Sequence, residues 1–212
     1  FHVLGCDINP MAHWIVAQAL TDLDCDTFRR TANEVIDDVE AEIGRFYRTE
    51  CGKCGAEANV KYFMWVKTAD CPYCSTSNDL FPGHLLAEAE RHPMNVVVCP
   101  HCGLLNEYEK IPCAASPAPC GGCSMPVQVE GHLNKKKVAC RVCDTSFPYT
   151  RSDAGPPKHR LWAIEYNCEA CYADLRGRQF KTPDKTDFQR IQDAAHLFEQ
   201  LRDNLPIPDD DI

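Results

Sequence analysis

Apolar positions at the start of the chain predict a short strand followed by a helix. Residues 2–8 are largely apolar and predict a strand. Residues 9–20 then have helical character, with Asn9 as the N-cap and Pro10 at the first helical position, where its missing N–H is harmless. Because the strand pattern is already under way at Phe1, we expect a further segment upstream of it.

Apolar residues spaced three or four apart predict two longer helices. The first covers about residues 26–48 and has a strongly acidic outer face, and the second covers about residues 184–204. Residues 205–212 follow as an extended acidic tail. The apolar stripe of the first helix is Phe28, Val35, Ile36, Val39, Ile43, Phe46 and Tyr47, and that of the second is Phe188, Ile191, Ala195, Phe198 and Leu201.

Between these helices, residues 50–180 read as short strands separated by proline and glycine turns. The 212 residues and 44% hydrophobic content suit one or two domains, and we expect a small, metal-stabilised α+β fold. Mean hydropathy is negative, and the sequence has no run of eighteen apolar residues and no signal-peptide pattern. We therefore expect no membrane partner and a cytoplasmic location.

Cysteine spacing carries the strongest chemical signal in the sequence. Twelve of the fifteen cysteines form six C-x-x-C pairs, several with the proline or glycine of a tight knuckle. Disulfides are the competing interpretation, but a reducing cytosol would not keep six such pairs oxidised. The predicted metal ligands are Cys51, Cys54, Cys71, Cys74, Cys99, Cys102, Cys120, Cys123, Cys140, Cys143, Cys168 and Cys171.

The distances between pairs indicate zinc ribbons. Consecutive pairs are separated by 16, 24, 17, 16 and 24 residues, room for two short strands and a turn. Four thiolates in a closed tetrahedron are the usual ligands of structural zinc, with iron as the alternative metal. Twelve ligands at four per ion predict three structural zinc ions.

The pairing of the knuckles is less determined by the sequence than their number. We expect the pairs at 51/54 and 71/74 to share one ion, since they flank a single strand-rich stretch. The other eight cysteines allow a sequential solution, 99/102 with 120/123 and 140/143 with 168/171. A nested solution instead joins 120/123 to 140/143 and 99/102 to 168/171; it is favoured here because the hairpin between its inner pairs turns at Gly131.

Three cysteines fall outside the pairs. Cys6 lies in the apolar strand and is interpreted as a small core residue, and Cys25 sits near the start of a helix. Cys113 lies in a proline- and alanine-rich loop, where it could replace a ligand, although a structural role is the simpler interpretation.

Charge is unevenly distributed. The formal net charge of −9 falls to about −15 once twelve thiolates and three zinc ions are counted, so the overall field would not attract DNA. Residues 132–181, however, carry ten Lys or Arg against five acids. This segment is either a lysine-solubilised hairpin tip or a face that contacts phosphates. The residues assigned to a nucleic-acid face are Lys135, Lys136, Lys137, Arg141, Arg151, Lys158 and Arg160.

The order of motifs resembles the zinc-ribbon-containing adenine-specific DNA methylases of bacteria and archaea, and the similarity covers nearly the whole chain. It rests on GCDINPMAHWIVAQAL, YRTECGKCGAEANVKYFMWVKTADCPYC, VVVCPHCG and RLWAIEYNCEACYADLRGRQFKTPDKTDFQRI. A strand that ends in Asp7 just before a helix is also where a nucleotide-binding α/β sheet places the acid for ribose hydroxyls, although such an acid can simply end a strand.

The resemblance implies a transfer of methyl from S-adenosylmethionine to a flipped adenine in double-stranded DNA. Residues 1–49 would be a fragment of the Rossmann-like cofactor domain, 50–181 the zinc-ribbon insertion, and 182–212 a helix and tail that lead back to the catalytic domain. Asp7 would hold the ribose hydroxyls, with Ile8 and Asn9 near the cofactor adenine. Restriction-modification or defence proteins would be its partners.

Two motifs of that family are missing from this sequence. It contains neither the glycine-rich F-x-G-G-G loop nor the (N/D)-P-P-Y motif, so no catalytic residue is assigned and the chain alone is expected to be inactive. An adaptor built of zinc ribbons, binding nucleic acid or protein without catalysis, is the alternative. A rubredoxin-like electron carrier is a third hypothesis and would bind iron.

Overall fold

The computed structural model describes residues 5–6, 8–90, 92–149, 158–171 and 179–205. Its elements are α-helices and antiparallel strands, an α+β fold as expected. The chain divides into two compact units, Phe1–Arg45 and Phe46–Ile212. The second unit contains the described strands and also the C-terminal helix.

The first unit contains two helices, α1 (Pro10–Ala19) and α2 (Cys25–Ile43). Asn9 caps α1 as predicted, because its side-chain oxygen accepts a hydrogen bond of 3.0 Å from the Met11 amide. Most of the predicted strand at residues 2–8 lies outside the described residues, but Gly5, Cys6 and Ile8 are described and belong to no strand. A Rossmann-like fragment is therefore not shown.

The helix predicted over about residues 26–48 ends earlier than residue 48. After α2 the backbone tightens into the 3₁₀ helix η1 (Gly44–Tyr47), and strand β1 (Arg48–Glu50) begins at once. Gly44 favours this end, since glycine is a weak helix former. The apolar stripe of α2 is half exposed rather than buried, with Phe28 at 57% and Ile36 at 62%.

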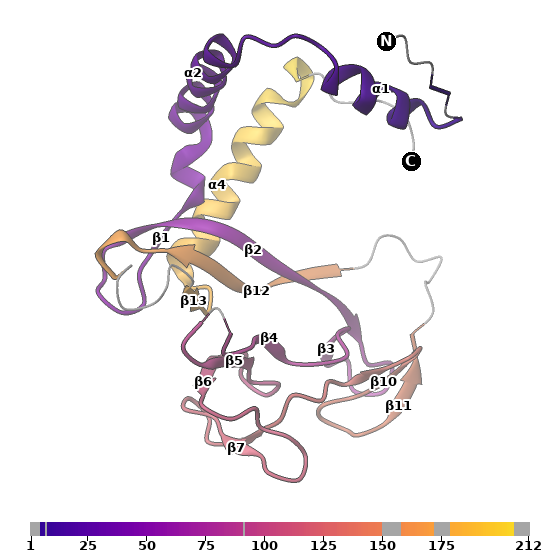
Figure 1. Ribbon diagram of the computed structural model, residues 1–212. Coiled ribbons are helices and arrows are strands. Elements are labelled where there is room, and N and C mark those ends of the chain that lie inside the picture. Colours follow the sequence, from indigo (N-terminus) through magenta and orange to yellow (C-terminus); the bar gives the residue numbers. More distant parts are fainter. Residues whose placement is uncertain (1–4, 7, 91, 150–157, 172–178, 206–212) are drawn as a thin grey trace. The chain divides into compact units, whose positions relative to one another are not determined.

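A five-stranded antiparallel sheet forms the centre of the second unit (Figure 1). Its two long strands are β2 and β12, which pair from Asn59 opposite Asn167 to Thr68 opposite Lys158. Strands of 14 and 10 residues were not expected from a sequence that predicted short strands. The members of the sheet are β1, β2 (Glu57–Asp70), β3 (Ser77–Asp79), β12 (Lys158–Asn167) and β13 (Gln179–Lys181).

Three smaller antiparallel sheets are built from the segment between β3 and β12. Each contains two or three short strands, as the sequence predicted for the ribbon region. They are β4 (Leu85–Ala87), β5 (Asn95–Val98) and β6 (Leu105–Tyr108); β7 (Ala118–Pro119) and β8 (Pro126–Val127); and β9 (Leu133–Asn134), β10 (Lys137–Ala139) and β11 (Ser146–Pro148).

The second unit has several small cores rather than one large core. Three of its four apolar clusters are centred on cysteines: Cys51 and Cys168 pack with Ile164, Cys71 and Cys140 with Val138, and Cys99 and Cys120 with Val97. Small cores bury too little apolar surface to be stable alone, so the sulfur groups at their centres are expected to supply much of the stability.

The C-terminal helix α4 (Lys185–Leu201) follows its prediction closely and continues as the 3₁₀ turn η3 (Arg202–Asn204). Asp184 and Asp187 form a reciprocal capping box at its start. Ile191 of its apolar stripe packs on the core around Cys51. Within the described residues, no helix combines the length and apolar character needed to cross a bilayer.

Candidate metal centres

The twelve paired cysteines converge in space into three groups of four. Within each group the four sulfur atoms lie within 4.8 Å of one another, so each group could hold a metal ion. The groups are Cys51, Cys54, Cys168 and Cys171; Cys71, Cys74, Cys140 and Cys143; and Cys99, Cys102, Cys120 and Cys123.

The three groups are concentric along the chain: the first knuckle meets the sixth, the second meets the fifth, and the third meets the fourth. The prediction that the 51/54 pair shares an ion with the 71/74 pair is therefore wrong. The two pairs sit at opposite ends of β2, whose 14 residues span about 45 Å in an extended strand. Antiparallel pairing of β12 with β2 instead brings the sixth knuckle to the first.

The nested solution for the other eight cysteines is also wrong, whereas the 99/102 and 120/123 pairs meet as in the sequential solution. Gly131 does not turn a hairpin between the fourth and fifth knuckles. Its amide donates to the Pro82 carbonyl at 2.9 Å, and a Cβ on Gly131 would collide with the backbone of residues 81–83. Glycine is needed there for a close backbone crossing.

Five of the six knuckles share one backbone geometry. The amide of the first cysteine donates to the carbonyl five residues later, and the amide four residues later donates back to that cysteine, as at Cys51 with Ala56 and Gly55. This turn requires a positive φ just after the second cysteine. The residues at that position are Gly55, Ser75, Gly103, Ser124 and Asp144, with φ between 54° and 79°.

Knuckle amides stabilise one thiolate in each group. Burial would raise the pKa of Cys51, but hydrogen bonds from the amides of Cys54 and Lys53 outweigh it and lower that pKa to about 6. Similar amide bonds lower the pKa of Cys120 and of Cys140 to about 6 as well.

A second thiol in each group holds its proton more tightly. Hydrogen bonding with Cys54, together with burial, raises the pKa of Cys171 to about 12. Burial raises the pKa of Cys99 to about 12 and that of Cys71 to about 11. Four sulfurs this close can all ionise only around a cation, so the donor set fits a thiophilic dication.

A buried asparagine contacts the second sulfur group, and another contacts the third. Each donates to a cysteine sulfur and accepts from a knuckle amide. Asn78 donates to the Cys140 sulfur at 3.8 Å and accepts from the Arg141 amide at 2.9 Å. Asn106 donates to the Cys120 sulfur at 3.6 Å and accepts from the Gly121 amide at 2.8 Å. We did not predict this role, although both asparagines stand four residues after the second cysteine of a knuckle.

In the first group, Tyr166 contacts a cysteine sulfur and a knuckle amide, as the asparagines do in the other two groups. Its hydroxyl accepts from the Gly52 amide at 3.0 Å and lies 3.7 Å from the Cys51 sulfur, to which it can donate. The position four residues after Cys54 is an alanine, Ala58, so a side chain from β12 supplies the contact. Such outer contacts orient metal ligands and tune their basicity.

Replacing Asn106 by leucine is expected to weaken metal binding at the third group about 10- to 100-fold, because the Cys120 sulfur loses a donor and the Gly121 amide loses its acceptor. Competition with a metal chelator measures this affinity. The matched control is Asn134→Leu, which changes an exposed asparagine of β9. Equal affinities in the two variants would contradict a supporting role for Asn106.

Of the three predicted cofactor residues, Ile8 and Asn9 are described, and both are exposed. Asp7 lies outside the described residues. The Ile8 side chain is fully exposed, and the Asn9 side chain is engaged in capping α1. The described part of the first unit contains no strand, so the sheet edge that would place a cofactor is not shown.

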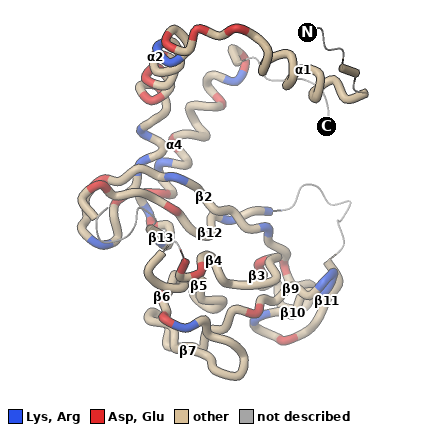
Figure 2. The backbone as a smooth tube through the Cα atoms, in the orientation of Figure 1, with Lys and Arg blue, Asp and Glu red and all other residues tan. Residues whose placement is uncertain are grey.

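Most of the predicted basic residues gather around His132. Lys135, Lys136 and Lys137 line one hollow of about 780 Å³ with His132. Arg141 and Arg160 line a second hollow of about 270 Å³, to which His132 also contributes. The backbone view shows lysine and arginine positions near β9–β11 as well as in other parts of the chain (Figure 2).

The other two basic residues are placed differently. Lys158 forms an ion pair of 2.8 Å with Asp70. Arg151 lies outside the described residues. The predicted nucleic-acid face therefore includes two cations that already have carboxylate partners, Lys158 with Asp70 and Arg160 with Asp79.

None of the three remaining cysteines joins a sulfur group. The prediction of Cys6 as a core residue is wrong, since it is exposed, and Cys25 is the exposed first residue of α2. Cys113 is half buried and forms an isolated bridge with Ser116.

Comparison with known proteins adds no assignment. No protein-family model matches the chain, and neither the curated proteins nor the solved structures contain a match. Function must therefore be argued from the geometry and from the residues themselves.

Proposed function

We propose that each group of four cysteines binds one structural zinc ion. The observation that carries this proposal is the convergence of all twelve paired sulfurs into three closed sets, each beside a small apolar core. Closed four-thiolate sets are typical of structural zinc and leave no open position for a catalytic water. The ions would replace the large core that this unit lacks.

Metal analysis of the purified chain tests the proposal. The expected result is a colourless protein with three zinc ions per chain, one for each group. An iron protein with strong visible absorption would instead favour the electron-carrier hypothesis, since iron also accepts four thiolates. Chains without bound metal but with oxidised knuckles would contradict both.

We further propose that the chain is a segment of an S-adenosylmethionine-dependent adenine DNA methyltransferase. The support is the motif order, together with a D-x-N-P segment whose Asn9 begins α1 as an N-cap. Asp7 would bind the ribose hydroxyls of the cofactor, with Ile8 and Asn9 nearby. The zinc region would contact DNA phosphates, in the cytoplasm and with restriction-modification or defence partners.

Methyl transfer to adenine in duplex DNA, followed with isotope-labelled S-adenosylmethionine, tests this assignment. The longer protein that contains this chain is expected to methylate DNA, and the 212 residues alone are expected not to. Asp7→Ala in the longer protein should lower activity at least about tenfold and leave the zinc content unchanged. Full activity of that variant would contradict the role of Asp7.

The adaptor hypothesis keeps one specific observation in its favour. All three sulfur groups and their cores lie in the compact unit Phe46–Ile212, which does not include the D-x-N-P segment. An adaptor of this kind would bind nucleic acid or a protein through the ribbons without catalysis. Binding by the longer protein without any methyl transfer would favour it over the methyltransferase.

A further inference from the structure

Two knuckles from different sulfur groups meet at the smaller hollow beside His132. Its walls are the third knuckle at Pro100–Gly103, the end of β3 with Ser77 and Asp79, and the side chains of Arg141 and Arg160. Arg141 belongs to the fifth knuckle and Arg160 to β12. At about 270 Å³ the hollow is smaller than a typical site for a drug-sized ligand and suits a compact group.

Both guanidinium groups at this hollow are held in place and keep spare donors. Arg141 donates from one nitrogen to the carbonyls of Pro100 and His101, each at 3.2 Å. Arg160 uses two of its three nitrogens on the carboxylate of Asp79, with Nε to Oδ1 at 2.7 Å. A guanidinium has five N–H donors, so donors remain on each arginine for a further acceptor.

Gly103 of the third knuckle lies beside Arg160 in this hollow. A Cβ on Gly103 would lie 4.0 Å from Nη1 of Arg160, the nitrogen for which no bond to Asp79 is found. The φ of Gly103 is +79°, which the knuckle requires and which a side chain would strain. Glycine at this position is therefore explained by the turn of the third knuckle.

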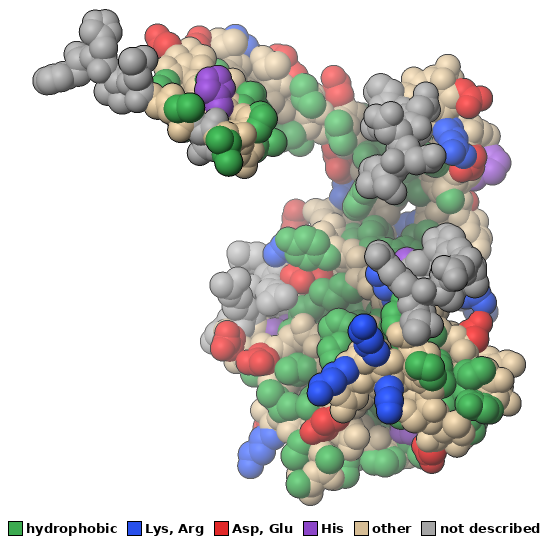
Figure 3. Space-filling view, turned by 90° about the vertical axis from the view of Figure 1, so that its right-hand side faces the viewer, with side chains coloured by type: hydrophobic (Ala, Val, Ile, Leu, Met, Phe, Trp, Pro, Cys, Tyr) green, Lys and Arg blue, Asp and Glu red, His purple; other side chains and the backbone are tan. Residues whose placement is uncertain are grey.

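His132 connects this hollow to the larger one. It lines both, and its buried Nε2 atom has no hydrogen-bond partner among the described residues. The larger hollow adds three exposed lysines at the turn between β9 and β10. The space-filling view shows lysine and arginine side chains gathered on one face of the unit that carries the strands (Figure 3).

We propose that the two hollows form one track for the sugar-phosphate backbone of duplex DNA, with a phosphate bound between Arg141 and Arg160 and neighbouring phosphates at Lys135–Lys137. This inference rests on the proposed contact with DNA and assigns its residues. Arginine forks match phosphate oxygens and hold them with directed bonds, whereas lysines act as point charges. The carboxylate of Asp79 offsets one of the two arginine charges at the smaller hollow, and its hydrogen bonds fix the orientation of Arg160.

Binding of a fluorescent duplex oligonucleotide to the zinc-loaded 212-residue chain tests the track. At about 0.1 M salt, Arg141→Gln is expected to weaken binding about tenfold, the loss of one charge-assisted contact. Lys136→Gln should weaken it less. A plot of the logarithm of the binding constant against the logarithm of the salt concentration has a negative slope. Each variant should make this slope shallower by about one unit, because one phosphate contact is lost. The matched control is Lys53→Gln, an exposed cation on the first knuckle outside both hollows.

Zinc content and melting temperature of each variant show whether it has kept its fold. Lys136→Gln changes an exposed side chain. A duplex with methylphosphonate linkages should bind at least about tenfold more weakly, since its backbone carries no charge. The track would be overturned if Lys53→Gln and Arg141→Gln lost equal affinity for the duplex, or if the native chain did not bind the duplex at all. Methyl transfer by the longer protein is measured separately, so either conclusion can fail alone.

Discussion

Replacing Cys51 and Cys168 together by serine is expected to remove one zinc ion from the chain, whereas replacing Cys51 and Cys71 should remove two. Cys51 and Cys168 belong to the same sulfur group, while Cys71 belongs to another. If neighbouring knuckles shared an ion instead, the two double variants would give the opposite result. Native mass spectrometry counts the bound ions directly, and the counts show which knuckles share an ion.

The accompanying loss of stability should be large. Zinc binding to a structural site supplies about 10 kcal/mol or more of folding free energy, which these small cores cannot replace. The first group ties the end of β12 to the start of β2, so its loss is expected to release that end of the central sheet. Amide hydrogen exchange would locate the release.

Cys25→Ser is the matched control for both double variants, because Cys25 is exposed and lies in no sulfur group. It should keep three ions and the native melting temperature, within the usual small effect of a surface substitution. Equal zinc loss in the two double variants would contradict the concentric pairing.

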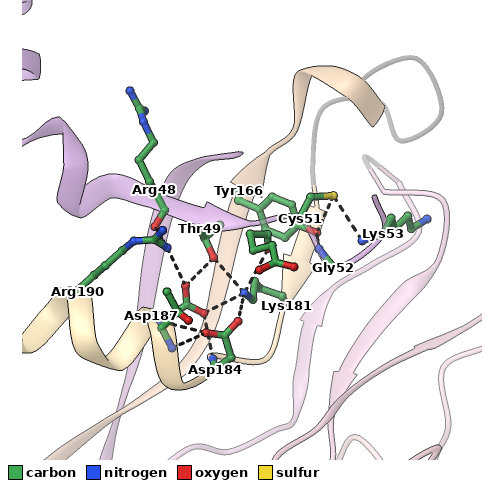
Figure 4. A network of polar contacts seen from close by, with 12 residues as sticks. Arg48, Thr49, Cys51, Gly52, Lys53, Tyr166, Lys181, Asp184, Asp187 and Arg190 are labelled. Atoms are coloured by element: carbon green, nitrogen blue, oxygen red, sulfur yellow. Dashed lines mark hydrogen bonds and ion pairs between the residues drawn. The ribbon is translucent and has the colours of Figure 1, made fainter. Parts of the chain in front are cut away.

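Replacing Asp187 by alanine is expected to destabilise the second unit by about 3–5 kcal/mol, the cost of breaking a buried ion pair. Asp187 is only 2% exposed, and it accepts the Thr49 hydroxyl at 2.6 Å and lies 3.0 Å from the Lys181 ammonium (Figure 4). The substitution leaves both partners without this acceptor. Chemical denaturation of the zinc-loaded protein measures the change in the free energy of unfolding.

The Asp187 network also supports the first metal group. Thr49 is two residues before Cys51, and Lys181 donates to the Glu50 carbonyl at 3.3 Å. Burial alone would lower the pKa of Lys181, but its hydrogen bonds to Asp184 and Asp187 outweigh burial and raise that pKa. Lys181 therefore stays charged beside β1, and the helix start is fixed to the strand that leads into the first knuckle.

Asp193→Ala is the control, since Asp193 is an exposed residue of the same helix whose bond to Gln189 is also exposed. It should change the free energy of unfolding by less than about 0.5 kcal/mol. Asp187→Asn, which keeps the size and can still accept from Thr49, should fall between the two. A loss in Asp187→Ala no larger than in Asp193→Ala would show that α4 is not anchored by this pair.

Local signals in the sequence were sufficient where the structure is local. Asn9 and Pro10 predicted the start of α1, because caps act within one turn of helix. The helical period placed the start of α4 within one residue of its observed start at Lys185. The helical period of α2 was also correct, but periodicity does not say what covers an apolar stripe, and Phe28 and Ile36 remain more than half exposed. The predicted end of that helix was wrong because the apolar period continues through Phe46 and Tyr47, whereas the α-helix ends at Ile43 before Gly44.

The sequence by itself identified the twelve cysteines that form the three sulfur groups, since a C-x-x-C knuckle is contained in four consecutive residues and the turn that follows them. Only the tertiary structure decided which knuckles share a group, because that depends on β2 pairing with β12 across about 90 residues of intervening chain. It also decided that Arg141 and Arg160 face one hollow and that Tyr166 reaches Cys51. Contacts of this kind join residues that are far apart in the chain, and no short pattern records them.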